Sequence, residues 1–90
     1  MRRLVTIDLR NADIALFEKY EALVLPLLSN YGAKLESQLR AIDNSKEIHF
    51  LSFPDTEKYE AYLADSDRLK VRHMWNNCGA VANSIEVISL

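Results

Sequence analysis

A chain of 90 residues has room for one domain, so residues 1–90 are expected to form a single domain. Hydrophobic residues make up 49% of the chain, and a small domain this apolar often covers its surplus by pairing with a partner. The net charge is −2 and no cluster of Lys and Arg forms, which argues against nucleic-acid binding.

Signals for export, membrane insertion and disulfide formation are not found in the sequence. No apolar run approaches the roughly 20 residues of a membrane span, and Asp8 interrupts any apolar stretch of a signal peptide. Cys78 is the single cysteine, which excludes an intrachain disulfide and fits a reducing compartment. We therefore expect a cytoplasmic protein without a membrane partner.

The first third of the chain predicts a strand followed by a long helix. Residues 3–9 alternate between apolar and polar side chains, as a half-buried strand does. Residues 11–13 then offer N-cap chemistry. Pro26 predicts a kink or break near Leu25, and Gly32 suits the left-handed position past the helix end. The apolar stripe of this helix consists of Ile14, Phe17, Leu23, Val24, Leu27, Leu28 and Tyr31.

The rest of the chain predicts three strands and helical segments between the last two. A short polar connection makes the second and third strands antiparallel. Asp55 is the expected N-cap of the next helix, whose apolar face is Tyr59, Tyr62 and Leu63. In chain order we expect a strand at 33–42, a hairpin connection at 43–46, a strand at 47–53, a helix after Asp55, a helical piece that starts at 65–67 and ends at 76–79, and a last strand at 84–90.

The order β-α-β-β-α-β predicts an α+β, ferredoxin-like fold, with a four-stranded antiparallel sheet and the helices on one face. Large apolar side chains are expected on both faces of two strands: Ile48 and Phe50 against Leu51 and Phe53, and Ile85 and Val87 against Ile88 and Leu90. The open face is therefore expected to be covered. A second copy of the chain, in a homodimer, is the simplest cover.

Short motifs in the chain resemble a small, functionally uncharacterised family of the dimeric α+β barrel superfamily. In that family an apolar strand ends in Glu-Phe-Pro and leads into a helix with an aromatic residue nine positions after the Phe, as Tyr62 follows Phe53 here. Its acidic residue is replaced by Ser52 in this chain. The motifs span residues 4–90 and comprise Leu51-Ser52-Phe53-Pro54-Asp55, Glu57, Ala61, Tyr62 and Leu63, with Tyr20, Pro26-Leu27-Leu28 and Tyr31-Gly32 upstream.

The resemblance implies a dimer in which two sheets face each other and enclose a barrel. Relatives in the superfamily include cofactor-free quinone-forming monooxygenases, aromatic-ring isomerases and haem-degrading enzymes. The monooxygenase-like members carry a Trp where Phe53 stands and a His where Tyr62 stands, so this chain departs from them at both positions.

His49 is the best candidate for a catalytic residue. It has the same strand parity as Leu51 and Phe53, and an imidazole in a partly dry barrel would have a tunable pKa. The structural alternative is a histidine satisfied by a cross-strand partner. No metal is expected, because His49 and His73 are too isolated to bind one.

Other polar residues are candidates for the same inward face. A carboxylate and an arginine beside His49 suit a small anionic or phenolic ligand; the alternative is an exposed strand face with weak cross-strand ion pairs, which we favour for the second strand at a sheet edge. The candidate ligand-binding residues are Asp8, Arg40, His49, Phe53, Tyr62 and Trp75, and Glu36, Gln38 and Glu86 could share their face.

No cofactor is expected. Gly32 and Gly79 are the only glycines and lie far apart, so no phosphate-cradling loop can form, and Cys78 has no evident base beside it. Three functions stay open: binding or transforming a small organic molecule in the dimer cavity, a non-catalytic dimerisation or interaction module, and, as a distant alternative, RNA binding through the open sheet face. Whether the protein is an enzyme is left open.

Overall fold

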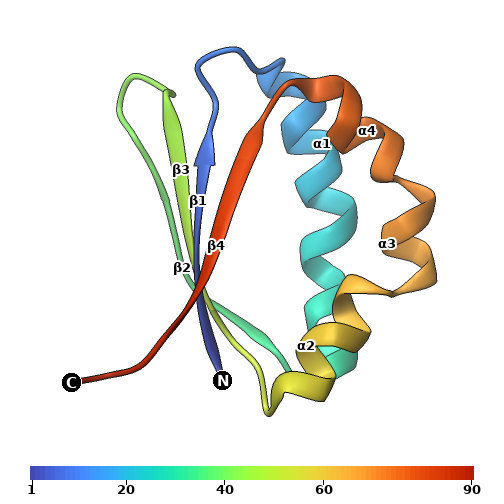
Figure 1. The fold of residues 1–90 in the computed structure, drawn as a ribbon. Helices are drawn as coiled ribbons and strands as arrows, with labels where there is room; N and C mark the ends of the chain where they lie inside the picture. Colours follow the sequence, from blue (N-terminus) through green and yellow to red (C-terminus); the bar gives the residue numbers. More distant parts are fainter.

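The computed structural model describes all 90 residues, as a sheet with every helix on one face (Figure 1). The strands are β1 (Arg2–Asp8), β2 (Lys34–Arg40), β3 (Lys46–Ser52) and β4 (Val81–Val87). The helical segments are α1 (Ile14–Val24), the 3-10 helix η1 (Leu25–Tyr31), α2 (Thr56–Leu63), α3 (Ser66–Lys70) and α4 (Arg72–Cys78). The antiparallel order β2-β3-β1-β4 confirms the predicted ferredoxin-like fold.

Local chemistry explains where the helices begin and end. The Asp13 carboxylate accepts from the backbone N–H of Leu16 at 3.1 Å, and Asp55 caps α2 through Lys58 N at 2.8 Å. Pro26 lies at the start of η1, where the α-helix gives way to 3-10 geometry, so the predicted break near Leu25 is confirmed.

The last strand begins and ends three residues earlier than expected. Arg2 of β1 pairs with Val87, so β4 has no further partner beyond that residue. Residues 88–90 extend away from the sheet as a tail (Figure 1), and Ile88 and Leu90 are exposed. The expectation that these two side chains cover a sheet face is therefore wrong. In β3, by contrast, Ile48 and Phe50 lie on one face of the sheet and Leu51 lies on the other, as expected.

A β-bulge in β2 changes which side chains share a face. The register shifts between Leu35 and Ser37, so Gln38 lies opposite His49 and Arg40 lies opposite Glu47, on the side of the helices. Glu36 falls on the other face, where its carboxylate accepts from Ser52 Oγ at 2.8 Å. Glu36 and Gln38, which were expected to share a face, therefore lie on opposite faces, and the expected place of this strand at the sheet edge is confirmed.

Two buried apolar clusters connect the sheet to the helix layer. The first consists of Leu28, Ala33, Leu51, Phe53 and Tyr62. The second consists of Ile7, Leu9, Phe17 and Cys78. They lie at opposite ends of the helix layer, which leaves room between them for the cavity described below. None of the helices combines the length and apolar composition that crossing a membrane requires.

Replacing Gly79 by alanine is expected to lower the free energy of unfolding by about 2–3 kcal/mol. Its φ is +83°, and a Cβ there would lie 2.6 Å from the backbone oxygen of Asn11, which cannot move aside freely. Gly32→Ala is the matched control, because its φ is also positive, at +66°, but its Cβ meets only the Pro54 ring at 3.1 Å. Urea unfolding measures both variants, and equal losses would contradict the steric argument.

Candidate functional site

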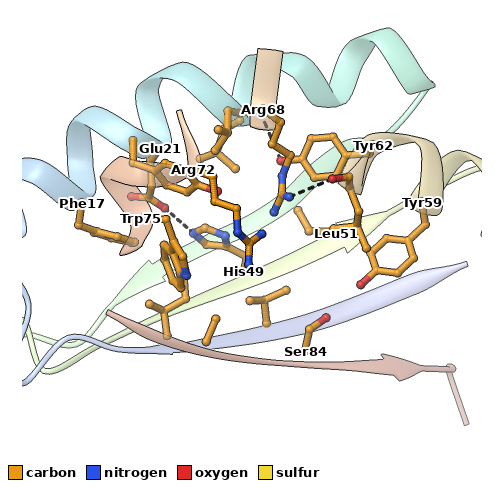
Figure 2. Close-up of a pocket in the computed structure, with 17 residues that line it drawn as sticks. Phe17, Glu21, His49, Leu51, Tyr59, Tyr62, Arg68, Arg72, Trp75 and Ser84 are labelled. Carbon is orange, nitrogen blue, oxygen red and sulfur yellow. Dashed lines mark hydrogen bonds and ion pairs between the residues drawn. The ribbon is translucent and has the colours of Figure 1, made fainter. Parts of the chain in front are cut away.

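A cavity of about 270 Å³ lies between the helix layer and the sheet (Figure 2). Twelve of its 17 lining residues are hydrophobic, so it favours an apolar ligand. Trp75 packs against Tyr20 with ring centroids 5.5 Å apart and helps to form one wall. Tyr59, Tyr62 and Leu51 form another part of the lining. The polar side chains in the lining are Glu21, His49, Arg68, Arg72 and Ser84.

His49 is the buried centre of the polar part of this lining. Its Nε2 lies 2.5 Å from Glu47 Oε2, its neighbour two residues earlier on the same face of β3. The same nitrogen lies 2.9 Å from Glu21 Oε2 on α1, a contact visible in Figure 2. Glu21, Glu47 and His49 retain only 7%, 2% and 5% of their surfaces. Three ionisable groups therefore converge at one nitrogen out of solvent.

One proton on Nε2 cannot satisfy both carboxyl groups. The hydrogen bond goes to Glu47, and Glu21 Oε2 is left buried without a donor aligned to it. A buried acceptor without a donor is costly, so a proton or a ligand group at Glu21 is favoured. Nε2 faces both carboxyl groups, which leaves Nδ1 as the ring nitrogen without a carboxyl partner.

The surroundings separate the pKa values of the two glutamates. Burial, together with the neighbouring Glu47, raises the pKa of Glu21 to about 7. Burial acts in the same direction on Glu47, but hydrogen bonds from Glu21, Arg40 and His49 outweigh it and hold the pKa of Glu47 at about 2. Burial lowers the pKa of His49, and its two carboxyl partners reverse this to a net rise. The pKa of Glu47 is thus lowered while those of Glu21 and His49 are raised, so Glu47 is the member of the cluster that most favours a negative charge.

Arg40 anchors the cluster from the neighbouring edge strand. Its guanidinium contacts Glu47 Oε1 through Nη2 at 2.6 Å and through Nε at 2.8 Å. Gln38 also approaches Glu47 Oε2, at 3.4 Å. The Glu47 carboxylate is thus engaged at both oxygens, which fixes the orientation of His49.

The same three residues are the one group of side chains with donor atoms close enough for a metal ion. One donor atom from each of Glu21, Glu47 and His49 lies within 4.8 Å of the others. However, Arg40 already supplies a positive charge beside Glu47, and His49 Nε2 is hydrogen-bonded to Glu47. Metal ligands must be deprotonated and have a lone pair free for the ion, so these donors fit a proton-sharing cluster better than a metal centre.

Arg68 offers an unpaired donor to the cavity. Its guanidinium lies over the ring of Tyr62, with Cζ 5.0 Å from the ring centroid. Its Nε–H is buried without a hydrogen-bond partner. The cavity therefore has an unsatisfied acceptor on Glu21 and an unsatisfied donor on Arg68, and a ligand with both a donor and an acceptor would satisfy them.

The structure brings together some of the residues named from the sequence and separates others. His49, Tyr62 and Trp75 line the cavity, and Arg40 reaches the cluster through Glu47. Phe53 is buried in the core beside Tyr62 and does not line the cavity. Asp8 lies on the opposite face of the sheet and pairs with Arg10 at 2.7 Å, so it does not converge with His49.

The expected location of the site is corrected. We expected His49 inside a barrel between two facing sheets, but its face of β3 lies beneath the helices (Figure 2). The cavity therefore belongs to one chain and not to the space between two sheets. The same observation removes the basis for a ligand that contacts His49 from the open face.

Two acidic residues of the cluster were missed by the sequence reasoning, although each left a signal. Glu21 lies one turn after Phe17 and one turn before Val24 or Leu25, so it is a charge on the apolar stripe of the helix. Glu47 has the strand parity of His49. Arg68 left no such signal, because α3 is a short polar helix without buried residues.

No known family profile and no curated protein matches this sequence. Solved structures do match it, over nearly the whole chain. A putative antibiotic biosynthesis monooxygenase from Nitrosomonas europaea has a TM-score of 0.72 at 7% identity, covering 99% of this chain and 100% of that one. SnoaB, a cofactor-independent oxygenase from Streptomyces nogalater, has a TM-score of 0.73 at 13% identity, covering 99% and 93%.

A dabb family protein from Mesorhizobium loti, described as having a ferredoxin-like fold, gives a TM-score of 0.61 at 18% identity and covers 98% of each chain. The fold is ferredoxin-like. This agrees with the resemblance drawn from the sequence motifs, while identities this low show the fold alone and assign no activity.

Proposed function

We propose that the chain binds a small, mostly apolar organic molecule with an acidic proton in the cavity, and that the Glu21–His49 pair takes this proton. One observation carries the proposal: a buried carboxyl and a buried imidazole, with Glu21 Oε2 and His49 Nε2 2.9 Å apart, line an apolar cavity of about 270 Å³. A general base is most effective when its pKa lies near the working pH, and burial raises the pKa of Glu21 to about 7.

Residues at two places in the cavity lining would have different roles in the proton transfer. His49 Nδ1 accepts the ligand's proton, while Glu47 and Arg40 hold the ring in place. Arg68 Nε–H donates to the oxygen on which negative charge develops. The aromatic wall around Trp75 contacts a planar ligand. This arrangement needs no cofactor for the proton transfer, and SnoaB, whose fold is similar, is a cofactor-independent oxygenase.

Calorimetric titration with 2-naphthol tests the proposal, with 2-methoxynaphthalene as a control that lacks the acidic proton. We expect 2-naphthol to bind, and to bind more tightly as the pH rises through about 7, because a Glu21–His49 pair that has lost its proton at Glu21 can take the ligand's proton at His49. Equal binding of both compounds at every pH, or binding of neither, would contradict the proposal.

Arg68→Met is expected to weaken 2-naphthol binding by about tenfold, the loss of one hydrogen bond from a charged donor. The control is Lys70→Met, which removes the same charge from the same helix at a side chain that is 75% exposed and outside the cavity. Titration calorimetry compares the two variants. If Lys70→Met weakens binding as much, the effect comes from net charge and not from the cavity donor.

The open face of the sheet supports a homodimer as part of the proposal. Leu4 lies beside Phe50 and Ile85 on the neighbouring strands, and Ile48 lies beside Leu39, so one apolar patch crosses the sheet. Leu39 and Ile85 are 60% and 49% exposed. The same face carries both signs of charge, in Arg2, Asp8, Glu36 and Lys46, which suits a self-complementary contact between two copies.

Phe50→Lys is therefore expected to convert dimers to monomers in native mass spectrometry, since it places a charge at the centre of the patch. The matched control is Leu63→Lys, at an exposed apolar residue on the helix side of the molecule. A wild-type protein that is monomeric at all concentrations would overturn the dimer.

A non-catalytic dimerisation module is the second candidate, favoured by the same exposed patch. It predicts dimers but no binding of 2-naphthol. RNA binding through this face lacks support, because Phe50 is the only aromatic side chain that the strands place on it and RNA-binding sheets stack bases on several. A cytoplasmic location remains a prediction from the single cysteine.

A further inference from the structure

Glu21 lies between two separate openings. On one side it lines the cavity, and on the other it lines a shallow groove between α1, η1 and β2. Glu21 and Leu25 are the only residues that belong to both linings. Leu25 cannot carry a proton, so Glu21 is the single ionisable connection between the two spaces.

The two spaces differ in polarity. The cavity is mostly apolar, whereas the groove has Glu18, Gln38 and Arg40 along its length. A proton removed from a ligand has no stable acceptor among the apolar walls of the cavity. The groove is open to solvent and offers water as the final acceptor.

Charged and titratable groups surround Glu21 from every element packed against it. Across the sheet these are His49 and Glu47 on β3 and Arg40 on β2. Within its own helix Glu18 pairs with Arg40 at 3.7 Å, and Tyr20 lies next in sequence. From the helices beyond the cavity they are Tyr62, Arg68 and Arg72. Among these groups only His49 contacts Glu21 at ion-pair distance, at 2.9 Å.

We propose that Glu21 carries protons between His49 and the solvent in the α1–β2 groove, so that a ligand and its proton use different openings. This rests on the proposed function and names the route that its proton takes. The ligand transfers H⁺ to His49 Nδ1 and keeps the electron pair. The Nε2 proton leaves its hydrogen bond with Glu47 for the Glu21 carboxylate, whose Oε2 lies 2.9 Å from the same nitrogen, and the resulting carboxylic acid releases H⁺ to a water molecule of the groove.

The rate at which the His49 Nε2–H proton exchanges with water, measured by NMR on ¹⁵N-labelled protein, tests the route without any ligand. Ala22→Trp covers the groove from an exposed position of α1 that does not line the cavity. Leu63→Trp covers the cavity from a position that does not line the groove. We expect Ala22→Trp to slow exchange by about tenfold and Glu21→Gln to slow it by about 100-fold, the lower range for a positioned acid–base group.

Leu63→Trp is expected to leave the exchange rate unchanged and to slow the entry of 2-naphthol. Glu21→Asp, which keeps the carboxyl group, is expected to restore part of the exchange that Glu21→Gln loses. The route would be overturned if Leu63→Trp slowed the exchange, or if Ala22→Trp and Glu21→Gln left the exchange rate unchanged. Failure of 2-naphthol to bind is a separate result that concerns the proposed function, because exchange is measured in the free protein.

Discussion

Replacing Arg40 by methionine is expected to lower the free energy of unfolding by about 3 kcal/mol, because it leaves the buried Glu47 carboxylate without its cation. Glu47 retains 2% of its side-chain surface, and the pair is 2.6 Å apart. Methionine keeps most of the aliphatic stem of Arg40, so the loss reports the charge more than the packing. Chemical denaturation at neutral pH measures the change.

The protein contains a matched control for this prediction. Arg10 and Asp8 form a pair of similar length, 2.7 Å, but their side chains are 74% and 37% exposed. Arg10→Met is therefore expected to change stability by less than about 1 kcal/mol. In the double variant Arg40→Met, Glu47→Gln, no uncompensated carboxylate remains, and part of the loss should return. Equal losses in Arg40→Met and Arg10→Met would show that burial of the Glu47 charge has no energetic consequence.

Glu21→Gln is expected to gain stability relative to the wild type as the pH rises from 4 to 8, by about 3 kcal/mol. Burial raises the pKa of Glu21 from 4.5 to about 7, so the folded state keeps this proton over a range in which the unfolded chain releases it. The stability that the group contributes is complete below pH 4.5 and is lost as the pH rises through about 7. Glutamine cannot ionise and does not show this loss.

His49 acts in the same direction. Its carboxyl partners raise its pKa, so its contribution is present below pH 6.5 and is lost as the pH rises through the folded value. Removing the Glu21 carboxyl makes the contribution of His49 to stability smaller, so the variant loses less of it as the pH rises. This adds to the gain in stability expected for Glu21→Gln. Glu18→Gln, on the exposed side of the same helix, is the control for removing a carboxylate from α1 and should change stability by less than about 1 kcal/mol. If the stability difference between Glu21→Gln and the wild type does not change with pH, the raised pKa of a buried Glu21 is contradicted.

The fold could be predicted from the sequence because local signals agreed with one another. The capping residues Asp13 and Asp55, the break at Pro26 and the alternation of β1 each fixed one element independently. The end of the last strand could not be predicted in this way. It depends on the length of β1, which ends the pairing at Val87, while the alternating pattern of residues 84–90 looks the same in or out of a sheet.

The candidate site could be predicted only in part. His49 was identified from its strand parity with Leu51 and Phe53, and Trp75 was named among the candidate ligand-binding residues. Its partner Glu21 comes from another element, and such a contact depends on how α1 lies over β3. The face of the sheet on which Arg40 lies depends on the bulge in β2, and no residue in 33–42 predicts that bulge. Which side of the sheet the helices cover is likewise a property of the whole fold.

An NMR titration of the glutamate side-chain carboxyl carbons, combined with the ring nitrogens of His49, tests the central claim most directly. The claim is that Glu21 and His49 form a buried pair that exchanges protons near neutral pH. We expect Glu21 to titrate at about pH 7, His49 Nε2 to carry the proton in the neutral ring, and both signals to respond to the same step. A Glu21 carboxyl that titrates near 4.5, independently of His49, would contradict it.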